Sequence, residues 1–167
     1  LTHVLLYFTN VLTLKLDENG VLTGSGVETY TGFDAAQLAE ALETISPDQR
    51  EQALQSSLSR YFGGADLSQL QVDTPREVGA TVTVRYQLRA ERFGRVEGEG
   101  RLVASSPTYP MMLGRRFLQV PSRVTPLFID ASEASVTRAT LQLPAGWKLV
   151  KPLGDLRVEG PSAAYVR

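Results

Sequence analysis

The chain has 167 residues, of which 43% are hydrophobic and 21% charged, and its formal net charge is -1 at pH 7. These values are typical of one globular domain that is large enough to bury a core. The absence of cysteine excludes disulfides, thiolate catalysis and metal sites built on sulfur. A single histidine, His3, removes most histidine-based metal and triad chemistry. We therefore expect no cofactor, no bound metal and no enzymatic activity.

Charge is distributed unevenly along the chain. Residues 1–83 carry four Lys/Arg and eleven Asp/Glu, whereas residues 84–167 carry thirteen and seven. One interpretation, which we favour, is that the two halves pack together with complementary charge; the other is a basic face for an acidic partner. The longest basic run is Arg115–Arg116, and aromatic residues do not alternate with basic ones, so nucleic acid is not an expected partner.

The ends and the length of the chain bear on its context. No segment approaches the roughly 18 apolar residues of a membrane span. Residues 4–8 are apolar, but they are few and lack a basic leader, so they do not form an intact signal peptide. Because the chain starts at Leu1 and shows no repeat or linker, we expect a single domain over 1–167, excised from a longer chain.

The first predicted element is a hairpin, with strands over 12–16 and 21–30 and a turn over 17–20. Gly24 and Gly26 lie two residues apart, so one face of the second strand lacks side chains there. They do not have the spacing of a phosphate-binding loop. A close approach of another backbone, or a bulge, is the favoured explanation.

Two helices are predicted next. Asp34 is the expected N-cap of the first, and Ser46 that of the second, with Pro47 in the first helical position and Gln49 closing a capping box. Apolar residues recur at helical spacing at Leu38, Leu42 and Ile45, and at Leu54, Leu58, Tyr61 and Phe62. Packing of these apolar residues against a sheet is favoured over an exposed helix pair that binds a partner.

Strands dominate the remainder of the chain. Apolar and polar residues alternate over 79–91 and 95–105, and residues 92–94 fit a three-residue loop between them. This hairpin would set Tyr86 and Leu88 over two glycines of its second strand. Further strands are expected over 67–73, 113–120, 123–130, 134–143, 146–151 and 155–166. The predicted fold is mainly β (α+β), an antiparallel β-sandwich with a two-helix insertion after the first hairpin.

Glu97 and Glu99 are expected on one strand face, and two such carboxylates can act as acid and base on a glycoside. In the predicted hairpin, however, Arg89, Arg95 and Arg101 surround them. A solvated cross-strand ladder of ion pairs explains the same pattern without chemistry, and we favour it.

The candidate ligand-binding residues lie later in the chain. Arg115, Arg116 and Arg123 can bind a carboxylate or phosphate through paired hydrogen bonds, and Tyr109 would contribute to an apolar wall beside them. The favoured alternative is an ordinary surface loop. Trp147 follows a turn and can stack on a sugar, although a lone tryptophan more often belongs to the core.

Several segments together resemble a known family. They are residues 14–26, the helix pair around Ser46–Pro47, the strand over 79–90, residues 143–147 and residues 158–161. The chain resembles the β-rich domains of unknown function that adjoin transglutaminase-like cores in large exported bacterial proteins. In that family the Cys-His-Asp chemistry belongs to the neighbouring domain. The resemblance therefore implies a non-catalytic accessory domain, located in the periplasm or cell envelope.

We therefore expect an accessory or interaction domain of a larger exported bacterial protein, whose partner is a neighbouring domain of the same protein. The alternative is a stand-alone module that binds a glycan or peptide. Its surface would be the loop over 107–123 or an exposed sheet edge that accepts an added strand. A hydrolase that uses acidic residues is a third, weaker hypothesis.

Overall fold

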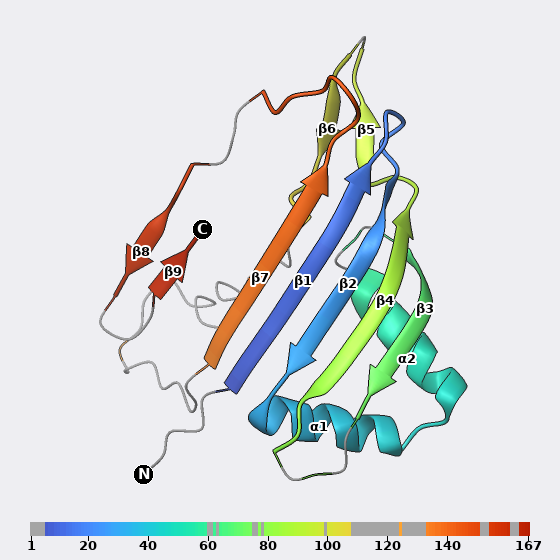
Figure 1. Ribbon diagram of the computed structural model, residues 1–167, viewed down its shortest axis with the longest axis vertical. Coiled ribbons are helices and arrows are strands. Elements are labelled where there is room, and N and C mark those ends of the chain that lie inside the picture. Colours follow the sequence, from blue (N-terminus) through green and yellow to red (C-terminus); the bar gives the residue numbers. More distant parts are fainter. Residues whose placement is uncertain are drawn as a thin grey trace.

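The computed structural model describes residues 6–59, 62, 64–74, 77, 79–98, 100–107, 124, 133–150, 154–160 and 164–167. A five-stranded sheet in the order β3-β4-β2-β1-β7 is its largest feature (Figure 1). Its strands are β1 (Leu6–Leu16), β2 (Leu22–Tyr30), β3 (Asp66–Asp73), β4 (Val82–Ala90) and β7 (Glu133–Gln142). The helices and most of the strands were thus correctly predicted as elements, and the fold is mainly β with two helices.

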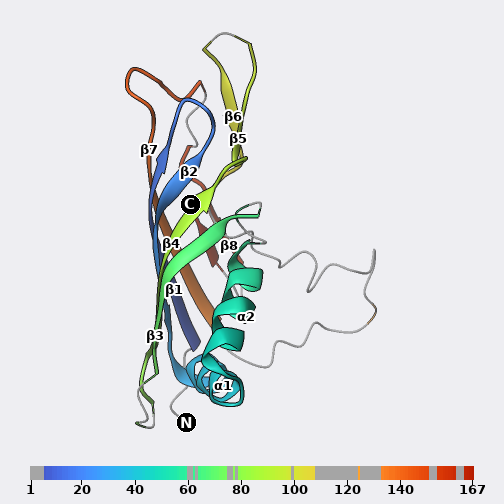
Figure 2. The ribbon, with the colours of Figure 1, turned by 90° about the vertical axis from the view of Figure 1, so that its right-hand side faces the viewer.

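Two helices, α1 (Gly32–Glu43) and α2 (Pro47–Ser59), cover one face of the sheet, which we call the inner face. Figure 2 shows the two layers edge-on, with the sheet on one side and the helices on the other. The core between them comprises Leu12, Leu14, Leu16, Leu22, Leu42, Leu54, Leu58, Phe62, Ala65, Val84, Tyr86, Leu88 and Ala90. The predicted packing of the helices against a sheet is confirmed. The opposite face of the sheet, the outer face, is covered by no described element.

The helix starts are set by local chemistry. In the predicted capping box, Ser46 N donates to Gln49 Oε1 (3.0 Å) and Gln49 N donates to Ser46 Oγ (3.4 Å). The prediction of Asp34 as an N-cap is wrong, because α1 begins earlier, after Thr31. Gly32 has a φ of 62°, which glycine adopts without a steric penalty, and this lets the chain turn from β2 into the helix. Asp34 lies in the first turn, where a negative charge favours the helix.

The first hairpin is confirmed, with β1 and β2 antiparallel. Both of its glycines mark close approaches, but the predicted approach of another backbone occurs only at Gly24, whereas Gly26 is covered by a side chain. A Cβ at Gly26 would lie under 3.0 Å from three atoms of the Tyr86 side chain, and one at Gly24 would meet the backbone oxygen of Thr13. Tyr86 therefore occupies the space that Gly26 leaves on the inner face.

The predicted hairpin over 79–105 is wrong. β4 pairs with β2 and β3, whereas β5 (Gly94–Val96) pairs with β6 (Leu102–Ala104) in a separate small hairpin. Gly98 and Gly100 have positive φ angles of 61° and 74°, so they form the turn of that hairpin and not the middle of a strand. Tyr86 therefore faces Gly26 of β2. Gly24 and Gly26 lie two residues apart, as Gly98 and Gly100 do, but they belong to a long, regular strand.

The sheet is not antiparallel throughout, because β7 runs parallel to β1. That part of the predicted fold is wrong, and the sandwich is not confirmed: helices, rather than a second sheet, cover the described inner face. The predicted strand over 155–166 is split into β8 (Arg157–Glu159) and β9 (Ala164–Val166), which pair only with each other. No strand forms among the described residues of 146–151, and the strands expected over 113–120 and 123–130 lie outside the described residues.

Candidate interaction surface

Most predicted ligand-binding residues cannot be placed. Arg115, Arg116, Arg123 and Tyr109 lie outside the described residues. Trp147 is half-buried in a turn after β7, in which its backbone N–H donates to the carbonyl of Pro144 (3.1 Å). It belongs to neither the buried core nor the most exposed surface, and its role in ligand binding stays a prediction.

The carboxylate of Glu97 is held in exposed ion pairs inside the β5–β6 hairpin. The predicted cross-strand ladder between 79–91 and 95–105 does not form, because those two segments do not pair. The Glu97 carboxylate pairs with Arg95, and Arg101 Nε lies 3.7 Å from Glu97 Oε2. Arg89 is not part of this cluster, because it lies on β4 and pairs with Glu91 at 2.5 Å. The remaining acidic candidate, Glu99, lies outside the described residues. The pairing observed for Glu97 is that of an exposed ion cluster and not of a poised general acid.

The described residues contain no group of three or more His, Asp or Glu side chains placed to hold a metal ion. None of the described helices has the length and apolar character needed to cross a membrane.

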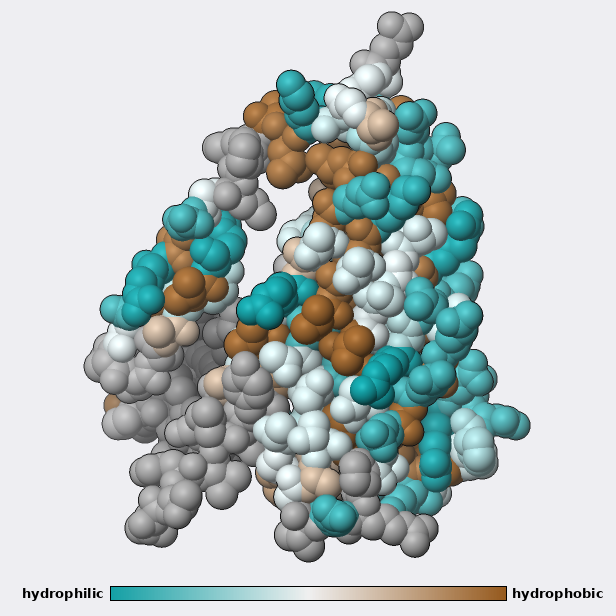
Figure 3. Space-filling view, viewed as in Figure 1, coloured by the Kyte–Doolittle hydropathy of each residue, from teal (hydrophilic) through white to brown (hydrophobic). Residues whose placement is uncertain are grey.

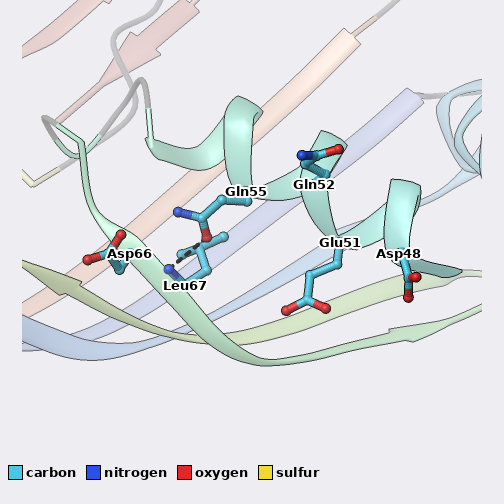
Figure 4. A pocket seen from close by; sticks show the side chains of 6 residues that line it. All are labelled: Asp48, Glu51, Gln52, Gln55, Asp66 and Leu67. Atoms are coloured by element: carbon cyan, nitrogen blue, oxygen red, sulfur yellow. Dashed lines mark hydrogen bonds between the residues drawn. The ribbon is translucent and has the colours of Figure 1, made fainter.

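A shallow pocket of about 530 Å³ lies between α2 and β3 (Figure 4). Its lining residues are Asp48, Glu51, Gln52, Gln55, Asp66 and Leu67. Gln55 Nε2 donates to the carbonyl of Ala65 (2.9 Å), and Gln55 Oε1 accepts from Leu67 N (2.7 Å). The Gln55 amide thereby pairs with the backbone as a neighbouring strand would, and it connects α2 to the start of β3. Sequence analysis missed this contact, because nothing in the helical pattern distinguishes Gln55 from other polar residues.

A second unpredicted feature is a polar row on the inner face. Glu28 is only 2% exposed, and its carboxylate accepts hydrogen bonds from the hydroxyls of Tyr30 (2.5 Å) and Tyr86 (3.2 Å). Asn10, its register partner on β1, is fully buried, and neither Oδ1 nor Nδ2 of its amide has a hydrogen-bond partner. Because an unpaired buried amide costs free energy, Asn10 reduces the stability of the fold.

The outer face of the sheet has a distinct composition. Along β7, β1, β2 and β4 the register places on it mainly threonine, serine, glutamine and valine, together with four cations. The cations are Lys15, Arg85, Arg89 and Arg138. No Asp or Glu occupies an outer-face position of these four strands, as the register and sequence show. Figure 3 views this face, where neutral and hydrophilic side chains surround a band of hydrophobic ones.

The cations flank an apolar centre. Val11 and Val27 are register partners, and Arg138 and Arg85 lie at the two ends of the same row. Val11 is 41% exposed although it lies on a central strand. Arginine beside partly exposed apolar side chains is a composition typical of protein interfaces.

Many of the described acidic residues lie on the two helices, on the other side of the sheet. α1 and α2 carry five of them, namely Asp34, Glu40, Glu43, Asp48 and Glu51, against the single cation Arg50. Among the described residues, the charge asymmetry of the sequence therefore appears as an acidic helix layer and a group of cations on the outer face. Asp66 of the first half is the register partner of Arg89 of the second half, and the predicted packing of the two halves through complementary charge stays a prediction. On the outer face Arg89 already has an anionic partner, since its Nε donates a hydrogen bond to the Glu91 carboxylate. This hydrogen bond raises the pKa of Arg89 above its usual value.

The two edges of the sheet differ. On β3 the pairing with β4 is interrupted between Ser68 and Gln71, and Gln69 has a φ of 53°. Such a bulge bends an edge strand and hinders the addition of another strand. β7 instead keeps an unbroken register with β1 over all ten residues, and no described strand pairs with its other side. The regular edge is therefore that of β7.

Comparisons with protein-family models, with curated proteins and with solved structures find no match for this chain. The family resemblance therefore remains an expectation. The features of the structure that bear on function are the two edges and the outer face of the sheet.

Proposed function

We propose that this chain is a non-catalytic interaction domain of a larger exported bacterial protein, and that it binds an extended polypeptide segment along β7. The observation that carries the proposal is the contrast between the bulged edge at β3 and the regular edge at β7. In strand addition, backbone hydrogen bonds supply affinity and the alternating side chains supply specificity. A ten-residue edge is long enough for several such bonds.

The context of the proposal comes from the resemblance to accessory domains beside transglutaminase-like cores. A segment of the neighbouring domain in the same parent protein is the proposed natural partner. The absence of cysteine from the sequence supports a non-catalytic role beside such a core, since the chain cannot supply the thiol. The proposal keeps one of the alternatives raised from the sequence, namely peptide binding at a sheet edge that accepts an added strand.

Hydrogen exchange measured by mass spectrometry tests the proposal directly. Ten-residue peptides selected against the chain from a display library would be added to the intact chain. Amides over 133–142 should become protected, because an added strand accepts hydrogen bonds from the outward N–H groups of β7. Amides over 66–73, on the bulged edge, should exchange at an unchanged rate. Protection centred on the turn around Trp147, or no protection over 133–142, would refute the proposal.

Adjacent proline substitutions provide a second test. Neighbouring residues of a strand direct their N–H groups to opposite edges, so Val136→Pro and Thr137→Pro remove donors from different sides of β7. One variant should lose peptide binding and remain stable, whereas the other should lose stability because it breaks a hydrogen bond to β1. Binding that survives in both folded variants would contradict strand addition.

A further inference from the structure

The side chains beside the β7 edge differ between the two faces of the sheet. Resting on the proposed strand addition, we infer that the added segment is an acidic amphipathic strand. Its apolar side chains would lie on the inner face, and its Asp or Glu side chains would lie on the outer face opposite Arg138. The partner class is therefore an extended acidic polypeptide segment.

The inner face sets the apolar half of this pattern. Ala139 and Leu141 of β7 are partly buried and pack against the core. They are the register partners of Leu12 and Leu14, which are fully buried. An added strand would continue these rows, so apolar side chains at every second position would cover the exposed parts of Ala139 and Leu141.

The outer face sets the acidic half. Arg138 would be the direct cross-strand neighbour of the segment, and Lys15 lies one strand further on, beside Gln142. Strands are spaced about 4.8 Å apart, so both cations fall within about one Debye length of the segment at physiological salt. Neither takes part in the ion pairs found among the described residues. Opposite charges across strands stabilise pairing and like charges oppose it.

The strand positions around Arg138 and Lys15 carry no opposite charge on the outer face. The outer-face positions of β7, β1, β2 and β4 carry no carboxylate, as described above. The outer-face acids of the sheet, Asp66 and Asp73, lie on β3 at the opposite edge, four strands from β7. A segment on β7 therefore meets Arg138 and Lys15 without a carboxylate on the strands beside them, which selects for acidic and against basic residues. Arg89, three strands from β7, is already paired with Glu91.

Two matched peptides test the inference. Both have ten residues with valine at alternate positions and threonine elsewhere, except that two outer-face positions are glutamate in one and lysine in the other. Fluorescence anisotropy with the intact chain should show up to about tenfold tighter binding of the glutamate peptide at low salt. Glutamate in place of lysine reverses the sign of the cross-strand pair with Arg138 and of the longer-range interaction with Lys15. The difference should decrease in 1 M NaCl.

Charge reversal in the protein provides the control. Arg138→Glu should invert the preference between the two peptides, whereas Arg101→Glu, at an exposed arginine between β5 and β6, should leave it unchanged. Equal affinities for the two peptides, with β7 amides protected by both, would overturn the acidic inference and keep strand addition. Lack of protection of β7 by these and by the library-selected peptides would overturn the proposed function and the inference with it.

Discussion

Gly26→Ala adds one methyl group at the centre of the sheet, where Tyr86 of β4 covers the glycine of β2. A Cβ there would lie under 3.0 Å from three atoms of the Tyr86 side chain, a separation that real Cβ atoms essentially never show. Tyr86 cannot move away freely, because it is 2% exposed and donates a hydrogen bond to the buried Glu28. Either the ring shifts and loses that bond, or the strands separate.

The size of the effect follows from these two terms. Overpacking of a well-packed core costs about 1–3 kcal/mol, and a lost hydrogen bond to a charged group contributes about 1.5–3 kcal/mol. Because the shift relieves part of the overpacking, we expect Gly26→Ala to lower the free energy of unfolding by roughly 2–4 kcal/mol. For a chain of this length the melting temperature should fall by roughly 5–15 °C.

Urea unfolding followed by circular dichroism measures the difference, and two glycines serve as comparisons. Gly154→Ala meets no atom within 4 Å, so its effect should stay within about 0.5 kcal/mol. Gly24→Ala meets the backbone of Thr13, which cannot rotate away, so its cost should at least equal that of Gly26→Ala. The order of the three variants tests the close approach independently of glycine's general effect on strands.

A double-mutant cycle identifies the cause. Tyr86→Leu removes the ring that the new methyl group would meet, so Gly26→Ala should cost about 1–3 kcal/mol less in that background. The penalty of Gly24→Ala should not be relieved by the same change. Additive effects of Gly26→Ala and Tyr86→Leu, or a neutral Gly26→Ala, would refute the packing of Tyr86 over Gly26.

Three further stability predictions use the same unfolding assay. Ser46→Ala should cost about 1 kcal/mol, because the capping box with Gln49 is lost; no change would show that the cap is not formed in solution. Asn10→Leu should raise the free energy of unfolding by about 1–3 kcal/mol by removing an unpaired buried amide, and a decrease would show that the amide is satisfied in solution. Gln55→Leu should cost about 1–3 kcal/mol, since it leaves Leu67 N without its acceptor; an unchanged midpoint would contradict the connection between α2 and β3.

Local patterns in the sequence were sufficient for the local structure. The Asp17 turn was correctly predicted, and Asp17 Oδ1 accepts from Asn19 N (2.9 Å) and Val21 N (2.8 Å). The start of the second helix was predicted for a physical reason that the structure confirms. Each of these features depends on residues a few positions apart, where spacing and side-chain chemistry determine the outcome.

Strand pairing was not predictable in the same way. Two pairs of glycines with the same spacing, Gly24 with Gly26 and Gly98 with Gly100, could each have lain opposite Tyr86. Only the backbone conformation distinguishes them, because Gly98 and Gly100 have positive φ angles and form a turn, whereas β2 is a strand. The alternation of apolar and polar residues is also the same in parallel and antiparallel strands, so it does not indicate that β7 runs parallel to β1. The candidate surface depends on both, because an edge and a charged face exist only after the strands are ordered. The sequence shows Arg138 as a residue, but it does not show that this cation lies on a strand with no described neighbour on its other side.

The parallel pairing of β1 with β7 has a consequence for the newly made chain. β1 gains β2 as a neighbour almost at once, but its other neighbour begins at residue 133, more than a hundred residues later. At synthesis rates of 5–20 residues per second, that edge of β1 stays open for roughly 6–25 s on the ribosome. Contacts so distant in sequence also form slowly after release. Until then, a strand bearing Leu12, Leu14 and Leu16 is open to pairing with other chains, and the arrival of β7 closes this edge.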